Sequence, residues 1–436
     1  MNSHRRQARP RGRGSLRGAA VLIHRYVGLV MAGFLLLAGV TGAIIVWNDE
    51  LDAAINPNLF HATKPDPDAK LLDRLVLREE VLRQLPNVDI EYARLEKTPG
   101  KNAIFGASGA IDPSTNQHSE LDFDEVFVNP YTGEVVGKRT WGDLSEGLTN
   151  LIPFIYKLHY TLALGVVGSY IFGLVALLWT IDCFVGAYLT FPRRQHKPTS
   201  RLGIVSWLKR WSPSWRVRWG ASAPKLNFDL HVAGSLVPWA MLLVFAWSSV
   251  AFNLSEVYRP AMSPFFEFQE YPSRSVSPNE RAATMTWHKA VARGHELAET
   301  LATKRDITLG EPFGLYYDHH GHFFAYGVRS ELDISADYGS IEVMFDATTG
   351  EYFGEFLSLG EASGDTITEW ILSLHMASVW GLPYRIFVTL LGILVAGVSV
   401  TGVLIWWRKR QARIFAAANR TRKARLSDTV SISAGQ

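Results

Sequence analysis

Four long apolar segments constrain the fold of this 436-residue chain more than any other feature of its sequence. They lie at about residues 20–47, 160–190, 231–253 and 384–407, and polar stretches of ordinary globular composition separate them. Each segment reaches the roughly 20 apolar residues that are needed to cross a bilayer. The sequence therefore predicts an integral membrane protein with four spans.

Basic residues indicate the orientation of these spans. Arg and Lys are frequent at the N-terminus (1–19), in a linker (192–229) and in the tail (408–436), whereas acidic residues are frequent in the segments 48–155 and 254–370. Because Arg and Lys favour the cytoplasmic ends of spans, both termini are predicted to be cytoplasmic and both long segments external. The predicted membrane segments are then residues 20–47, 156–191, 230–253 and 371–407.

The first apolar segment is predicted to be a retained anchor. It exceeds the roughly 7–15-residue core of a signal peptide, and no convincing cleavage site precedes WNDELDAAINP. The single cysteine, Cys183, lies in the second apolar segment. One cysteine excludes a disulfide within the chain and a CxxCH haem attachment motif.

Recurring features indicate an internal duplication. His24 and His231 are 207 positions apart, and His159 and His375 are 216 apart. Between them, the sequences VFVNPYTGEVVGKR and VMFDATTGEYFGEF place their shared glycine 217 positions apart. The chain is therefore predicted to contain two copies of one unit: a span, an external domain, a Leu-His pair and a second span.

Each external segment is predicted to be an α+β domain. In the second, NERAATMTWHKAVARGHELAETLATK has helical periodicity, and GEPFGLYYDHHGHFFAYGVRS and GSIEVMFDATTGEYFG have strand patterns with turns. In the first, LLDRLVLREEVLRQL is the predicted helix and LDFDEVFVNPYTGEVVGKR the strand pair. The predicted fold is an α-helical membrane bundle of four spans with two external α+β domains.

The linker contains Trp207, Trp211, Trp215 and Trp219, one every four residues, among Lys and Arg. In a helix these indoles would share one face, as in an amphipathic segment that lies on the inner leaflet. Pro213 must interrupt or begin such a helix. A docking surface for a cytoplasmic partner is the alternative.

One histidine accompanies each apolar segment: His24, His159, His231 and His375. A single histidine at such a place would ordinarily make an interfacial hydrogen bond. Here the predicted topology puts His24 and His231 near the cytoplasmic side and the other two near the external side. Each side then has one histidine from each half, and two facing imidazoles are the ligand set of six-coordinate haem iron. The pattern predicts two haem groups, one for each pair.

Glycines near these histidines would let a flat macrocycle approach the helices. They follow the histidines by three to six positions: Gly28, Gly165, Gly234 and Gly381. Zinc or copper fits less well, because the spans offer no Cys or Met ligand at helical spacing from a histidine apart from Met376, which lies on another face. A proton relay would need acidic residues, of which Asp182 is the main candidate within the spans.

Several of these segments resemble the PepSY-associated transmembrane family, often described as iron-regulated membrane proteins. They are HRYVGLVMAGFLLLAGVTG, the two TGE hairpins, LHYTLALG, LHMASVWG and GVSVTGVLIWWRKR, and together they extend from His24 to Arg410. The resemblance implies PepSY-like domains in the periplasm and a bacterial inner-membrane location. It also implies two b-type haem groups on the four histidines and a haem-dependent ferric-siderophore or ferric-chelate reductase. Substrate residues do not transfer, because no specific motif matches.

The sequence YYDHHGHFFAY supplies a candidate contact for iron or a siderophore, formed by Asp318, His319, His320 and His322. The alternative is a polar hairpin tip, where Asp, His and Gly tolerate unusual backbone angles. In a strand, alternation would place His320 and His322 on the same face.

The predicted partners are membrane lipid, a ferric siderophore or other ferric chelate, and a cytoplasmic or quinol electron donor, with no nucleic acid. The donor must be separate, because the sequence has neither a P-loop nor a GxGxxG motif after a strand. A non-redox membrane module that binds or regulates a periplasmic partner is the alternative function. A transporter is disfavoured because the spans contain few polar residues to line a path.

Overall fold

The computed structural model describes residues 16–112, 117–193, 204–277, 284–335 and 338–433, with side chains up to Thr421. Parts of the predicted basic N-terminus, linker and tail therefore lie outside the described residues. The chain forms two compact units. Unit 1 comprises Met1–Val40, Ile171–Val250 and Leu390–Gln436, and unit 2 comprises Thr41–Tyr170 and Ala251–Thr389.

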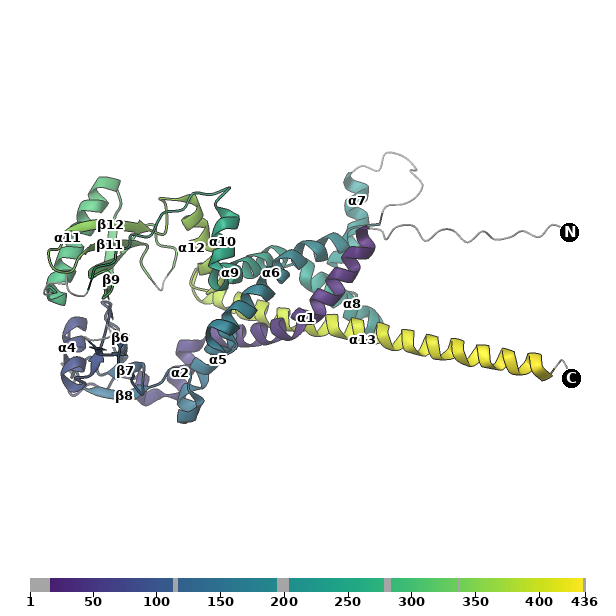
Figure 1. Cartoon of the computed structure of the whole chain (residues 1–436), viewed down its shortest axis with the longest axis horizontal. Helices are drawn as coiled ribbons and strands as arrows, with labels where there is room; N and C mark the ends of the chain where they lie inside the picture. The colour runs from purple at the N-terminus through teal and green to yellow at the C-terminus, as the bar shows by residue number, and fades with distance from the viewer. Residues whose placement is uncertain (1–15, 113–116, 194–203, 278–283, 336–337, 434–436) are drawn as a thin grey trace. The chain divides into compact units, whose positions relative to one another are not determined.

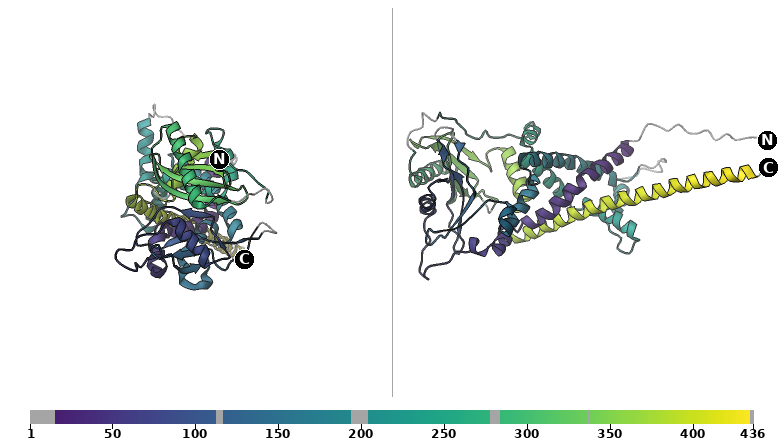
Figure 2. Two further views of the ribbon diagram at one scale, coloured as in Figure 1. Left: turned by 90° about the vertical axis from the view of Figure 1, so that its left-hand side faces the viewer. Right: turned by 60° about the horizontal axis from the view of Figure 1, so that its bottom comes forward.

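Among the described residues, three helices are long and apolar enough to cross a membrane. They are α1 (Leu16–Ile45), α6 (Gly165–Thr190) and the first 40 residues of α13 (Leu382–Ser433). Figures 1 and 2 show α13 as one uninterrupted helix. The chain is thus a multi-pass membrane protein. Three of the four predicted spans contain a continuous apolar helix, which covers only part of the predicted segments 156–191 and 371–407.

The predicted third span is divided in two. Helices α8 (Ala223–Leu236) and α9 (Trp239–Asn253) are bent by 66° at the break between them. Pro238 occupies this break, where it lacks the N–H that a continuous helix would use and its ring crowds the preceding turn. The structure therefore has a fourth span only if this bent pair crosses the membrane as one.

Breaks also precede α6 and α13, each a few residues after a Leu-His pair. Helix α5 (Leu151–Thr161) ends before α6, and α12 (Ser363–His375) ends before α13. Gly165 and Gly381 restart the chain with φ of 59° and 62°, a left-handed conformation that glycine adopts without steric cost. His159 and His375 therefore lie at the ends of short helices that precede the apolar ones.

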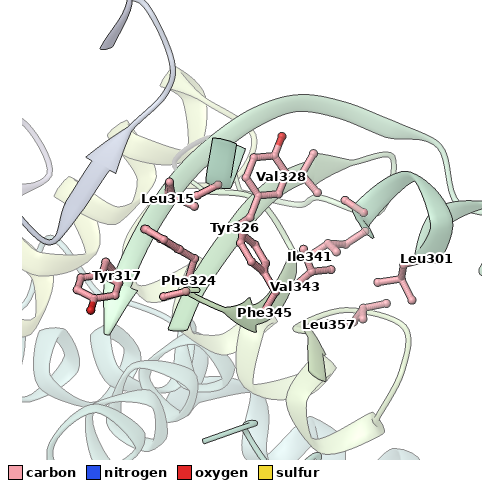
Figure 3. Close-up of a cluster of buried hydrophobic side chains, with 13 residues drawn as sticks. Leu301, Leu315, Tyr317, Phe324, Tyr326, Val328, Ile341, Val343, Phe345 and Leu357 are labelled. Atoms are coloured by element: carbon pink, nitrogen blue, oxygen red, sulfur yellow. The ribbon is translucent and has the colours of Figure 1, made fainter. Parts of the chain in front are cut away.

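A five-stranded antiparallel sheet, in the order β12-β11-β10-β9-β2, forms the largest sheet of unit 2. Helix α11 packs against it over a core in which Phe324, Tyr326 and Phe345 are fully buried (Figure 3). Gly294 of α11 permits this approach, because a Cβ there would lie 2.4 Å from Cγ of Tyr326. The elements are α11 (Trp287–Arg305), β2 (Tyr92–Arg94), β9 (Leu309–Asp318), β10 (Phe323–Ser330), β11 (Ile341–Asp346) and β12 (Tyr352–Leu357).

A second sheet in unit 2 has the order β3-β7-β8 and shares its buried cluster with α4. Two short ladders, β1–β4 and β5–β6, lie in the same part of the chain. The helix and strands predicted for both external segments are thus present. The elements are α4 (Arg74–Gln84), β1 (Val88–Asp89), β3 (Ala103–Gly106), β4 (Ser108–Gly109), β5 (Ile111–Asp112), β6 (Gln117–His118), β7 (Glu125–Val128) and β8 (Val135–Arg139); shorter helices are α2 (Asn48–Ile55), α3 (Pro57–Phe60), η1 (Leu144–Asn150) and α10 (Ser255–Met262).

Strand β2 joins the two predicted external segments. Its residues pair antiparallel with β9, with Tyr92 opposite Tyr316 and Arg94 opposite Gly314. An ion pair between Arg329 and Glu96, with an N–O distance of 2.7 Å, lies beside this pairing. The segment 48–155 therefore supplies the edge strand of the sheet that the segment 254–370 forms.

The two TGE hairpins have matching turns. The backbone carbonyls of Asn129 and Asp346 each accept a hydrogen bond, of 2.9 Å, from the N–H of Gly133 and Gly350 respectively. Both glycines have positive φ, 77° and 72°, which glycine adopts without steric cost. Burial raises the pKa of Asp346, but backbone N–H groups and Arg274 oppose this and lower it to about 2. Asp346 is therefore an ionised acceptor at neutral pH.

The tryptophan-rich linker is only partly helical. Helix α7 (Ile204–Trp211) is followed by a 3-10 helix, η2 (Ser212–Trp215), so that Pro213 begins a new helical turn. The first three indoles of the series contact in sequence, with ring centroids 5.0 Å apart at each step. Trp219 lies beyond η2 and is 75% exposed. The predicted shared face therefore holds for three of the four tryptophans.

Candidate functional site

The structure brings the four span-associated histidines together in the two predicted combinations. The imidazole centroids of His24 and His231 are 6.1 Å apart within unit 1. Those of His159 and His375 are 6.4 Å apart within unit 2. We call these the 24/231 pair and the 159/375 pair.

Both histidines of the 24/231 pair use Nδ1 to contact an oxygen on an apolar helix. Nδ1 of His24, on α1, lies 3.0 Å from both carboxylate oxygens of Asp182 on α6. Nδ1 of His231, on α8, lies 3.1 Å from the carbonyl oxygen of Val398 on α13. Since a carbonyl or ionised carboxylate oxygen only accepts, each Nδ1 donates a proton, and the neutral ring keeps its lone pair on Nε2. Metal-binding imidazoles are commonly held in this way.

The 159/375 pair is built from the ends of α5 and α12. Nδ1 of His159 lies 2.9 Å from the Thr41 hydroxyl oxygen, near the end of α1. The ring of His375 packs edge-to-face against Phe252, at a centroid distance of 5.5 Å. This pair therefore has polar support on one ring and aromatic packing on the other.

Two glycines that the sequence interpretation missed lie directly against histidine rings. A Cβ at Gly42 would come within 3.0 Å of Cε1 of His159, and one at Gly402 within 3.0 Å of Cε1 of His231. Each belongs to a Val-Thr-Gly sequence near the end of a span, GVTGAI in α1 and SVTGVL in α13. This repeated tripeptide is the signal that could have identified them.

The contacts of the 24/231 pair fall at corresponding positions of the chain. Val398 lies 216 positions after Asp182, and Gly402 lies 216 after Gly186, whose added Cβ would lie 3.7 Å from Cε1 of His24. The two Leu-His pairs have the same offset. The pair is nevertheless electrostatically uneven, because one histidine meets a carboxylate and the other a neutral carbonyl.

The glycines that were predicted to make room beside the histidines do not lie against them. Among the described residues, a Cβ at Gly28, Gly165 or Gly381 would have no non-local atom within 4 Å, and one at Gly234 would meet only Val398 and Leu394. Gly165 and Gly381 instead lie at the breaks before α6 and α13, where the backbone has a positive φ. Spacing along one helix was an insufficient guide, since close approach depends on which faces the neighbouring helices present.

The histidine-rich sequence forms a hairpin tip between β9 and β10. His320 is exposed, whereas His322 is only 4% exposed and has φ of 51°. The two ring nitrogens of His322 lie 2.9 Å from the hydroxyl oxygens of Tyr317 and Thr348. Asp318 accepts a hydrogen bond from the backbone within the tip. His320 and His322 therefore have different surroundings, and the unusual backbone angle matches the hairpin-tip interpretation.

A separate hollow of about 720 Å³ lies on unit 2. Its lining carries both signs of charge, including Glu96, Lys97 and Arg329, together with His288. None of the four paired histidines lines this hollow. It is therefore distinct from the histidine pairs.

Comparison with known protein families gives a match over most of the chain. The model of the family described as "PepSY-associated TM region" matches residues 21–409, which include both histidine pairs. No curated protein matches the chain.

Proposed function

Because the chain belongs to the PepSY-associated TM region family, we propose that it is a b-type dihaem oxidoreductase that reduces ferric iron, held in a siderophore or another chelate, by passing electrons across a membrane. The proposed setting is a bacterial inner membrane, with cytoplasmic termini and the reduction in the periplasm. A cytoplasmic or quinol donor supplies the electrons, and each electron converts one Fe(III) to Fe(II).

The observation that carries this proposal is the spacing of the two histidine pairs. Imidazole–metal bonds of about 2 Å place the centroids of two facing ligands roughly 6 Å apart. The centroid distances are 6.1 and 6.4 Å. When bound, haem would supply one-electron Fe(III)/Fe(II) chemistry at each pair.

The residues around the pairs would orient the proposed ligands. Asp182 and the Val398 carbonyl hold the protons of His24 and His231 on Nδ1, which leaves Nε2 for iron. The Thr41 hydroxyl gives His159 a partner at the same nitrogen. The paired histidines thus suit a haem iron held by two imidazoles, both in the atoms they offer and in their spacing.

The proposed function is tested on the detergent-purified protein, expressed with haem supplied. We expect absorption bands of low-spin b-type haem at about two groups per chain. After reduction under anaerobic conditions, a ferric hydroxamate chelate should reoxidise these bands and release Fe(II), measured with a ferrous-specific chelator. The matching Ga(III) chelate, which does not accept an electron under these conditions, is the control. A colourless protein would contradict the proposal and leave the periplasmic binding module as the explanation.

Substitution of the two glycines that lie against histidine rings, Gly42 and Gly402, tests each proposed haem site separately. Gly42→Val should weaken haem retention at the 159/375 pair, and Gly402→Val at the 24/231 pair, because the new side chain overlaps the ring position. Overpacking of about 1–3 kcal/mol corresponds to a loss of affinity of roughly fivefold to 150-fold. Haem per chain after gel filtration measures the loss.

Matched controls lie in the same two helices. A Cβ at Gly33 of α1 or Gly397 of α13 would meet no atom within 4 Å. Gly33→Val and Gly397→Val should therefore retain haem at the wild-type level. Equal losses in all four variants would mean that the glycines act through the stability of the helices and not through the histidine rings.

A further inference from the structure

A second group of potential metal ligands lies in unit 2, apart from the histidine pairs. Asp89, Glu91 and His118 each offer a ligand atom, and these atoms lie within 4.8 Å of one another. His319 joins them, with its Nε2 2.6 Å from Oδ2 of Asp89 and 3.5 Å from Oε1 of Glu91. We call these four residues the carboxylate–histidine cluster.

The pairing of β2 with β9 explains why residues so distant in sequence meet. Beyond the paired residues, the N–H of Tyr317 donates a hydrogen bond of 2.8 Å to the carbonyl of Glu91. Continuing this antiparallel alignment by two residues brings Asp89 opposite His319. His118 belongs to β6, which pairs with β5, so a further pair of strands contributes to the cluster. The cluster therefore rests on backbone pairing and not only on side-chain flexibility.

The hydrogen bonding of His118 leaves Nε2 as its ligand atom. Its Nδ1 lies 2.7 Å from the carbonyl oxygen of Gly109, so Nδ1 must donate. In the neutral ring, Nε2 then presents a lone pair to Oε1 of Glu91, 3.1 Å away, which also only accepts. Either a second proton on the ring or a divalent cation bound by both atoms resolves this opposition. A backbone carbonyl behind a ligating imidazole is also the usual support of a metal-bound histidine.

The charge around the cluster favours the same occupant. Two carboxylates face one nearby guanidinium, that of Arg78, whose Nη2 is 3.8 Å from Oδ1 of Asp89. Arg78 is also engaged elsewhere, over the Trp287 ring at 3.8 Å and with the carbonyl of Ile90 at 3.0 Å. The four cluster side chains are between 20% and 34% exposed, so that an ion can reach them from solvent.

We propose that Asp89, Glu91, His118 and His319 bind one divalent first-row transition metal ion. Two imidazoles and two carboxylates form a mixed nitrogen and oxygen ligand set, which suits Zn²⁺, Fe²⁺ and neighbouring ions better than Ca²⁺ or Mg²⁺. The bound ion links the two external segments across the junction of β2 and β9. This site is independent of the proposed electron transfer, since none of its residues belongs to a histidine pair.

The test uses the full-length, detergent-purified protein after dialysis against EDTA. Isothermal titration with Zn²⁺ should show a site of about one ion per chain that Glu91→Gln and His118→Ala each weaken at least tenfold. Co²⁺ bound to the wild-type protein should give visible absorption bands that Zn²⁺ removes by competition. The matched control is His320→Ala, which changes an exposed histidine of the same hairpin outside the cluster and should bind Zn²⁺ as the wild type does.

Thermal midpoints measured with and without Zn²⁺ distinguish loss of the metal site from loss of the fold. Glu91→Gln preserves side-chain size, so its thermal midpoint without metal should match that of the wild-type protein. Adding Zn²⁺ should raise the midpoint of the wild type and of His320→Ala, but not that of Glu91→Gln. Unchanged Zn²⁺ affinity in Glu91→Gln and His118→Ala, or no binding by the wild type, would overturn the proposal, whatever the haem content of the protein.

Discussion

Alanine at any one of the four paired histidines is expected to reduce the haem content of the purified protein from about two groups per chain to about one. His24→Ala and His231→Ala should remove the same group, because their rings form one pair at 6.1 Å. His159→Ala and His375→Ala should remove the other. The physical reason is that each variant removes one of the two imidazoles that would hold one of the proposed haem groups.

Double variants distinguish this pairing from any other. His24→Ala combined with His231→Ala removes both ligands of one group and should leave about one haem per chain. His24→Ala combined with His159→Ala removes one ligand from each group and should leave almost none. Haem extracted into pyridine and divided by protein concentration gives the count, and His288→Ala, at a half-exposed site outside the pairs, is the control. Equal haem in the two double variants would contradict the pairing.

The sequence was sufficient to predict which histidines pair, but not what surrounds them. The Leu-His repeat and the apolar segments predicted the partner of each ring. The oxygen partners, Asp182 and Val398, come from other helices, so their contacts depend on helix packing and rotation. The same holds for Gly42 and Gly402, which are distant in sequence from the rings they touch.

Local sequence patterns predicted the two TGE hairpins and helices α4 and α11, because turn residues and periodicity are short-range signals. Strand β2 has only three residues, too few for a pattern, and its partner β9 is more than 200 positions away. The strand pairing between the segments 48–155 and 254–370, and with it the carboxylate–histidine cluster, could therefore not be inferred. The break in the third apolar segment, in contrast, could have been predicted from Pro238, because proline interrupts a helix.

The second large effect concerns a buried charge network in unit 2. The Arg139 side chain is 3% exposed, and its guanidinium contacts Asp52 at 2.9 Å and Glu125 at 2.6 Å. These contacts connect α2, β7 and β8. Burial raises the pKa of Glu125 even with Arg139 beside it. Removing the cation would leave two carboxylates close together in a poorly solvated place.

Arg139→Met is therefore expected to destabilise the protein by about 3–5 kcal/mol, because the uncompensated carboxylates cost more than the lost contacts. Without the cation, the folded-state pKa of Glu125 rises further above its unfolded value. Protonation then relieves the repulsion at low pH, and stability falls as the pH rises through the folded-state pKa. The loss of thermal midpoint in detergent, followed by circular dichroism, should accordingly be larger at pH 8 than at pH 5.

Two comparisons make this result specific to the network. Arg83→Met removes a guanidinium that is 70% exposed and pairs with Glu80 on the surface of α4, so the midpoint should change little at either pH. Adding Glu125→Gln to Arg139→Met removes one of the two opposed carboxylates and should recover part of the midpoint, mostly at pH 8. A loss that neither varies with pH nor responds to Glu125→Gln would show that Arg139 acts through the packing of its side chain and not through its charge.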